Sequence, residues 1–115
     1  MIGNGVHLGV GAIIQAHGGI HIHDHCTTSA GCKLYTLSND VTQCHNGTTG
    51  ERLPYILKPI VLERNVWLGL NVCVVGGTVG ADSFAQPNTV ITHNTPPNAI
   101  LRGFPAQVIK QRFYQ

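Results

Sequence analysis

Residues 62–91 read Leu62-Glu-Arg-Asn-Val-Trp, Leu68-Gly-Leu-Asn-Val-Cys, Val74-Val-Gly-Gly-Thr, Val79-Gly-Ala-Asp-Ser-Phe, Ala85-Gln-Pro-Asn-Thr-Val, followed by Ile91. An apolar residue opens each unit of six, and the unit that begins at Val74 is one residue short. A period of six matches neither an amphipathic helix nor a simple alternating strand. It is typical of a parallel β-helix, in which each hexad forms one short strand and a corner, and three hexads complete a triangular coil. The repeat therefore predicts an all-β solenoid.

The amino-terminal third carries the same spacing. Positions expected to face inward recur every six residues in two rows, which are Ile2, Leu8, Ile14, Ile20, Cys26 and Cys32, and Val6, Ala12, Gly18, Asp24, Ala30 and Thr36. We therefore expect two coils of eighteen residues from Ile2 to Leu37, and about four coils in all. Gly3-Asn4-Gly5 and Gly9-Val10-Gly11 resemble pieces of a phosphate-binding loop, but no helix follows them, so we interpret them as corner glycines with positive φ.

Two segments depart from the repeat. Residues 38–59 interrupt it with a stretch that has no periodicity of its own, and loops of this length are often functional, so we predict an active-site loop here. Pro96-Pro97 ends the repeat, and residues 97–115 are expected to form a capping segment. Within that segment, Ala106 to Phe113 is predicted to be a short C-terminal helix that covers exposed strand edges. The whole chain, 1–115, is expected to be a single domain.

Composition narrows the function classes. Only 10% of the residues are charged, 14 are glycine, and the formal net charge is +2, which is too small to indicate nucleic-acid binding. The sequence shows no basic and apolar leader and no apolar run of about 18 residues, so we expect a cytoplasmic protein without a membrane span. Cys26 and Cys32 fall on inward positions, where a thiol acts as a small hydrophobe, and no spacing suggests a disulfide or a zinc finger.

Histidine is unusually frequent, with seven residues. By the hexad count, five of them face outward, which are His7, His17, His21, His23 and His25. A coil of eighteen residues predicts that His7 stacks on His25 and that His21 stacks on Asn39. Imidazole suits zinc, but a zinc site needs three or four converging ligands, and no carboxylate partner is evident. We therefore expect surface or interface histidines and no metal.

The chain resembles the hexapeptide-repeat acyltransferases, in particular the sugar and polysaccharide O-acetyltransferases. The resemblance covers nearly the whole chain and is carried by Lys58-Pro59-Ile60, Val66-Trp67-Leu68-Gly69, Gly77-Thr78-Val79-Gly80, Thr89-Val90-Ile91-Thr92, Pro96-Pro97-Asn98-Ala99-Ile100 and Gly103-Phe104-Pro105-Ala106-Gln107-Val108-Ile109-Lys110. It implies a left-handed coil, a homotrimer with active sites between subunits, acetyl-CoA as co-substrate, and a sugar, nucleotide-sugar or oligosaccharide acceptor, as in polysaccharide biosynthesis.

The same resemblance suggests which residues bind the coenzyme. The pantetheine arm should lie along a face that carries Trp67, Gly69, Leu70 and Pro87. Thr92 and His93 should lie near the coenzyme, where the family usually has a Thr-Lys pair. Lys110 and the position of Gln107 should approach the coenzyme phosphates. The family often has Arg where Gln107 stands, so affinity would depend more on Lys110 and Arg102.

The catalytic position departs from the family. Related enzymes have a Ser-His-Asp or Thr-His stretch at the start of the loop, and its histidine is the general base. Here Leu34 to Asp40 reads Leu-Tyr-Thr-Leu-Ser-Asn-Asp, so Asn39 takes the place of that histidine. An amide cannot usefully accept a proton at pH 7, although acyl transfer to a hydroxyl needs a base. Either another histidine serves (His45, His21 or His17), or the protein binds without catalysing, or Asn39 is an engineered replacement.

The sequence thus predicts an acetyl-CoA-dependent O-acetyltransferase that acts on a sugar or polysaccharide-precursor hydroxyl. A catalytically impaired scaffold or binding member of the same fold is the alternative, favoured by Asn39. A zinc carbonic-anhydrase-like protein is a third possibility, which would need three histidines that meet across a subunit boundary.

Overall fold

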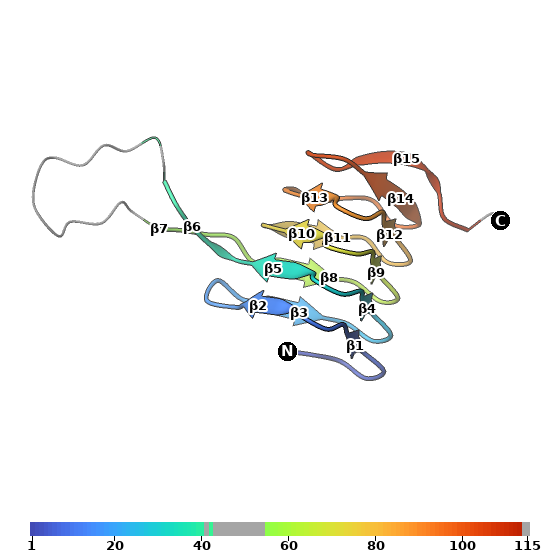
Figure 1. Cartoon of the computed structure of the whole chain (residues 1–115), viewed down its shortest axis with the longest axis horizontal. Helices are drawn as coiled ribbons and strands as arrows, with labels where there is room; N and C mark the ends of the chain where they lie inside the picture. Colours follow the sequence, from blue (N-terminus) through green and yellow to red (C-terminus); the bar gives the residue numbers. More distant parts are fainter. Residues whose placement is uncertain (41, 43–54, 114–115) are drawn as a thin grey trace, which may run out of the picture.

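A computed structural model describes residues 1–40, 42 and 55–113 of the chain. In this part the chain winds into stacked coils, and three sheets, whose strands are parallel except at the carboxyl-terminal cap, form the faces of the stack (Figure 1). No helix occurs among the described residues. The predicted parallel β-helix is therefore confirmed, whereas the predicted C-terminal helix is wrong.

Each sheet collects one strand from each successive coil. The first sheet contains β1 (His7–Leu8), β4 (Thr27–Thr28), β9 (Trp67–Leu68), β12 (Phe84–Ala85), β14 (Ala99–Arg102) and β15 (Gln107–Gln111). The second contains β2 (Ile13–Gln15), β5 (Lys33–Tyr35), β10 (Cys73–Val74) and β13 (Val90–Ile91). The third contains β3 (Ile20–Ile22), β8 (Ile60–Leu62) and β11 (Gly77–Val79). The strands are short because every coil must turn three corners.

The register shows that the first coil is two residues longer than predicted. Ile2 pairs with Ile22, and His7 pairs with Thr27, so this coil has twenty residues rather than eighteen. After Ile14, both rows of inward-facing residues therefore lie two positions later in the sequence than predicted. Asp24 and Ala30, which were expected inside, are exposed at corners. The prediction that His7 stacks on His25 is therefore wrong.

The predicted stacking of His21 on Asn39 is also wrong. His21 pairs with Val61 of β8, because the coil leaves the stack after Leu37 and resumes only at Ile60. Asn39 instead pairs with Tyr55 in an antiparallel hairpin formed by β6 (Leu37–Asn39) and β7 (Tyr55–Leu57). Figure 1 shows this hairpin running away from the stacked coils.

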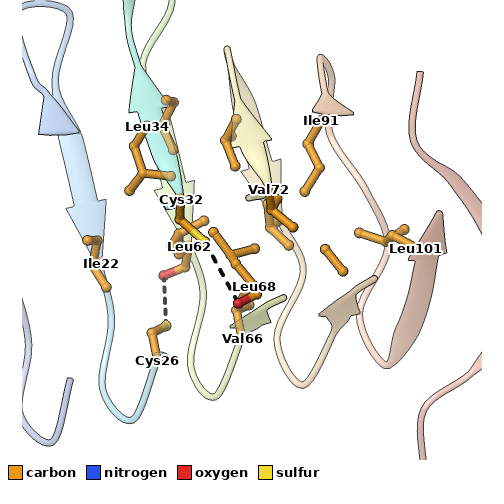
Figure 2. Packing of buried hydrophobic residues seen from close by; sticks show 14 of the residues in the cluster. Ile22, Cys26, Cys32, Leu34, Leu62, Val66, Leu68, Val72, Ile91 and Leu101 are labelled. Carbon is orange, nitrogen blue, oxygen red and sulfur yellow. Dashed lines mark hydrogen bonds between the residues drawn. The ribbon is translucent and has the colours of Figure 1, made fainter. Parts of the chain in front are cut away.

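The core follows the hexads of the second half closely. The openers Leu62, Leu68, Val74, Val79, Ala85 and Ile91 are all buried. Figure 2 shows Leu62, Leu68 and Ile91 among the side chains that fill the interior. Cys26 and Cys32 lie in the same core, as predicted, and their Sγ atoms donate to the carbonyl oxygens of Glu63 at 3.0 Å and Gly69 at 3.1 Å. Apolar burial of this kind is the main favourable contribution to folding.

The corners require residues that tolerate a left-handed backbone. Nine corner residues have a positive φ, and each lies three positions after an inward-facing residue at the end of a strand or bridge. They are Gly5, Gly11, His25, Gly31, Asn65, Asn71, Asp82, Asn88 and Asn98. Glycine adopts this conformation without steric cost, and Asn and Asp tolerate it better than other residues. The prediction of positive φ is confirmed for Gly5 and Gly11 and is wrong for Gly3 and Gly9. Gly3 serves a different need, since an added Cβ would lie only 3.0 Å from the backbone nitrogen of Asp24.

The carboxyl-terminal segment caps the coil as a strand. Gly103, with φ of 101°, reverses the chain, and β15 then pairs antiparallel with β14. This pairing satisfies the backbone groups of an otherwise open sheet edge, whereas an isolated helix of eight residues would be marginally stable. Arg112 anchors the end of the segment, since its Nη1 donates to the carbonyl oxygen of Asn65 at 3.0 Å.

Within the described residues there is no helix of a length and apolarity that could cross a membrane.

Candidate functional site

A cavity of about 630 Å³ opens on the outer face of the second sheet, next to the β6–β7 hairpin. Its lining comes from β5, β10 and β13, from the base of the hairpin, and from the turn before β15. The lining residues are Lys33, Tyr35, Thr36, Leu37, Ser38, Lys58, Cys73, Val75, Val90, Thr92 and Phe104. It is the size of a small-ligand site, mostly apolar with a few polar groups.

Strand alternation explains why these side chains face the cavity. Successive side chains of a strand point to opposite faces of the sheet. Leu34, Val74 and Ile91 point into the coil and are buried. Their neighbours on either side, at positions 33 and 35, 73 and 75, and 90 and 92, therefore point outward and form the floor of the cavity. The hexads that build the core thus also dictate the cavity.

Two lysines line the cavity. The Lys33 Nζ donates to the carbonyl oxygen of Gly31 at 2.8 Å and to Oδ1 of Asn71 at 3.0 Å, which ties it to a corner of the coil. The stem of Lys58 packs against Gly76, where an added Cβ would lie 3.0 Å from the Lys58 Cβ. The two lysines give this apolar site a positive charge.

A thiol and a hydroxyl also face the cavity. Burial raises the pKa of the Cys73 thiol above 9.0, and the nearby Lys33 ammonium group opposes that shift. The thiol is therefore protonated near neutral pH. The Thr92 hydroxyl lies 3.0 Å from Nδ1 of His93, within hydrogen-bond distance. Thr92 is the member of the predicted coenzyme set that lines this cavity.

The structure separates the predicted catalytic residues. Asn39 ends β6, directly after Ser38, which lines the cavity. His17 is exposed at the corner between the second and third sheets, and the adjacent Gly18 amide donates to the Thr36 hydroxyl at 2.7 Å. His21 lies on β3 in the third sheet, where its ring stacks on His23 with centroids 4.1 Å apart. His45 lies outside the described residues.

The predicted pantetheine residues lie on the first sheet and at its corner with the second. The Trp67 ring packs edge-on against Phe84, with centroids 5.4 Å apart, and its Nε1 donates to the Ser29 hydroxyl at 3.2 Å. Gly69, Leu70 and Pro87 form the corner, and an added Cβ at Gly69 would lie 2.7 Å from the carbonyl oxygen of Ala85. Along the chain, Leu70 is followed by β10 and Pro87 by β13, and the outward side chains of these two strands form part of the cavity floor.

The predicted phosphate-binding residues all lie at the capping end of the first sheet. Arg102 ends β14 and pairs with Gln107, the first residue of β15, while Lys110 pairs with Ile100. All three side chains are exposed. All three residues therefore lie at the same end of the stack, so they could contact the phosphates of one coenzyme molecule.

Several lining residues were not found from the sequence. Lys33, Tyr35, Cys73 and Lys58 face the cavity, and Phe104 lines it from the turn before β15. The hexad pattern could have predicted Lys33, Tyr35 and Cys73, because residues on either side of a buried strand residue must face outward. The contribution of Lys58 and Phe104 depends on chain reversals that the hexad pattern does not specify.

In the part of the chain that the structure describes, no group of three or more His, Cys, Asp or Glu side chains is placed to hold a metal ion.

Comparison with known proteins identifies the family. A family model described as the hexapeptide repeat of succinyl-transferase matches residues 1–35 and 59–93. These two ranges make up more than half of the chain and lie on either side of the interruption. The chain belongs to the hexapeptide-repeat acyltransferase family.

Curated members of this family match part of the chain. Galactoside O-acetyltransferase from Escherichia coli (strain K12) is 35% identical over 54 residues, which cover 46% of this chain and 27% of the relative. A putative lipopolysaccharide biosynthesis O-acetyl transferase, WbbJ, from the same strain is 38% identical over 53 residues, which cover 45% and 27%. The matched segment thus spans about a quarter of these relatives.

Solved structures of family members match nearly all of the fold. A hexapeptide-repeat containing acetyltransferase from Vibrio cholerae matches with a TM-score of 0.86 and 29% identity, covering 98% of this chain and 62% of that one. A structure of a Vibrio cholerae protein of the same description, complexed with acetyl coenzyme A, matches with a TM-score of 0.77 and 26% identity, covering 98% and 66%.

Proposed function

We propose that the protein is an acetyl-CoA-dependent O-acetyltransferase that acts on a hydroxyl group of a sugar or polysaccharide precursor. The observation that carries the proposal is the cavity beside the β6–β7 hairpin, at the start of the interruption where the family resemblance implies the acceptor site. The Vibrio cholerae structure with acetyl coenzyme A supports the coenzyme, and the galactoside O-acetyltransferase supports the acceptor class.

In the proposed arrangement, the pantetheine arm follows the corner at Leu70 and Pro87 and brings the thioester to the cavity near Thr92. The acceptor enters from the side of Ser38. The acceptor oxygen attacks the thioester carbonyl carbon, its proton passes to a base, and the carbon–sulfur bond breaks to release coenzyme A. A hydrogen-bond donor directed at the carbonyl oxygen stabilises the negative charge that develops there.

The base is the open step of this mechanism. Asn39 continues the strand beyond Ser38, so it can orient the acceptor hydroxyl, but its amide does not take up the proton. We propose that a histidine provides the base, with His45, His17 and His21 as candidates. His17 is favoured over His21 among the described residues, because it neighbours Gly18 at the base of the hairpin.

Assembly and location are part of the same proposal. We infer a homotrimer whose subunits meet along the exposed face of the second sheet, where Ile13, Tyr35 and Leu70 leave apolar surface uncovered. Covering this surface would stabilise the assembly by about 25 cal/mol per Å² of apolar area. A left-handed coil and a cytoplasmic location belong to the family expectation.

Two measurements on three proteins test the proposed function. Calorimetric titration with acetyl-CoA measures coenzyme binding, and release of coenzyme A with a panel of sugar acceptors measures transfer. Asn39→His should raise transfer by about 10² to 10⁴, the range typical of a positioned base. If His45 is already the base, His45→Ala abolishes transfer and Asn39→His adds little. Absence of both binding and transfer in all three proteins would contradict the proposal.

A binding protein without catalysis is the second candidate, favoured by Asn39 itself. In that case the wild type binds acetyl-CoA or the sugar without transfer, and Asn39→His creates activity from a near-zero level.

A further inference from the structure

The charges that line the cavity are all of one sign. Lys33 and Lys58 both contribute to its wall, and no Asp or Glu is among its lining residues in the described part of the chain. Lys33 is half-buried and Lys58 is exposed. Two lysines beside a mostly apolar surface lower the free energy of a bound anion relative to a neutral ligand of the same shape, because the attraction between opposite charges is stronger beside an apolar surface than in bulk water.

None of the carboxylates of the described residues lines the cavity. Asp24, Glu63 and Asp82 lie at the corner between the third and first sheets, across the coil from the cavity. Asp40 follows β6, and its Oδ1 accepts a hydrogen bond from the backbone nitrogen of Thr42 at 3.0 Å. The positive charge of the cavity is therefore not neutralised by the coil that builds it.

The two lysines differ in what holds them. The Lys33 ammonium group already donates two hydrogen bonds to a corner of the coil. No described residue forms a hydrogen bond or ion pair with the Lys58 ammonium group, although the Lys58 stem is held against Gly76. Lys58 thus presents an exposed cation, with its stem beside Gly76, whose charge has no partner among the described groups.

We propose that the cavity selects an acceptor with an anionic group, a sugar phosphate or a sugar carboxylate, and that Lys58 binds that anion. The inference rests on the proposed acetyltransferase function and narrows its acceptor class. The coenzyme phosphates have the same chemistry, but their predicted contacts, Arg102, Gln107 and Lys110, lie at the capping end of the first sheet rather than on the cavity wall. The test therefore separates the two sources of phosphate.

The experiment compares acceptors with and without an anionic group at one position of the sugar. Glucose 1-phosphate and methyl glucoside share all their ring and primary hydroxyls, whereas methyl glucuronide has a carboxylate in place of the primary hydroxymethyl group of methyl glucoside. The anionic member of a pair should have a KM at least about tenfold lower, which corresponds to about 1.4 kcal/mol. Lys58→Met keeps the stem that packs on Gly76 and should remove this preference. Lys58→Arg should retain most of it, and added salt should weaken it.

Arg64→Gln provides the matched control, because it removes one positive charge at the corner of the third and first sheets, where Arg64 pairs with Asp82. It should leave the preference unchanged. Calorimetry with coenzyme A and with pantetheine gives the second readout, and Lys58→Met should alter neither affinity.

Three results would overturn the inference while the proposed function stands. They are equal or better use of neutral acceptors, an unchanged preference in Lys58→Met, and a selective loss of coenzyme A affinity in Lys58→Met, which would assign the cation to the coenzyme. A wild type that neither binds acetyl-CoA nor releases coenzyme A with any acceptor refutes the proposed function and this inference with it.

Discussion

The two core thiols predict a specific loss of stability at alkaline pH. Cys26 and Cys32 are 0% and 1% exposed, and burial raises the pKa of each thiol above its ordinary value of 9.0. Above that value the unfolded chain releases both protons while the native coil keeps them. The native state then binds more protons than the unfolded state, so the free energy of unfolding falls as pH rises.

The magnitude follows from the number of thiols. One group contributes at most about 1.4 kcal/mol per pH unit between its unfolded and native pKa, so the pair contributes at most about 2.7 kcal/mol per pH unit. Cys26→Ala/Cys32→Ala should lose stability at all pH values, because two core side chains become smaller, but it should show a shallower decline above pH 9.

The assay is urea denaturation followed by circular dichroism between about pH 7 and pH 10, under reducing conditions. All other ionisable groups are common to both proteins, so the difference between the two curves isolates the thiols. Cys73→Ala serves as a control, since Cys73 is only half-buried and should change the slope less. Parallel curves for the wild type and the double variant would refute the reasoning.

Two further substitutions test the packing of the coil by urea denaturation. Thr95→Val should raise the free energy of unfolding by about 1 kcal/mol, because the Thr95 hydroxyl is buried without a hydrogen-bond partner among the described groups, and a loss of stability would contradict this. Gly77→Ala should lower it by more than about 2 kcal/mol, because φ is 98° and the new Cβ would lie 2.6 Å from the carbonyl carbon of His93. Gly19→Ala, at the same φ but with no described atom within 4 Å, should cost less, and equal losses would refute the steric argument.

The sequence predicted the coil well where a single period continues without interruption. From Leu62 to Ile91 every opener is buried, and even the short unit at Val74 keeps the frame, since the next opener, Val79, returns to the core. The inward positions were predictable because each hexad repeats the same local geometry.

The first coil shows where such counting fails. Two extra residues between Ile14 and Ile22 shift the frame, and the shift moves Asp24 from the predicted interior to the surface. Glycine and alanine fit both corners and inward positions, so residues 16–19 gave no warning of the insertion. The charge of Asp24 was the available signal, because an unpaired buried carboxylate is costly.

The cap and the cavity depend on contacts between distant segments. The sequence of β15 is compatible with either a short helix or a strand. The strand forms because it pairs with the otherwise open edge of β14. Similarly, Lys58 reaches the cavity only because the β6–β7 hairpin returns the chain beside Leu37. Asn39 was found from the resemblance alone, and its pairing with Tyr55 depends on the same hairpin.

The most direct test of the central claim is whether acetyl-CoA occupies the cavity. Cys73 lines it, so alkylation of this thiol by N-ethylmaleimide reports on access. The measurement uses Cys44→Ser, which removes the cysteine outside the described residues, and mass spectrometry to follow labelling; Cys26 and Cys32 should stay unlabelled because they are buried. Saturating acetyl-CoA should slow the labelling of Cys73 at least about tenfold, the change expected if the thioester end covers most of the open cavity. An unchanged labelling rate in the presence of saturating acetyl-CoA would contradict the account.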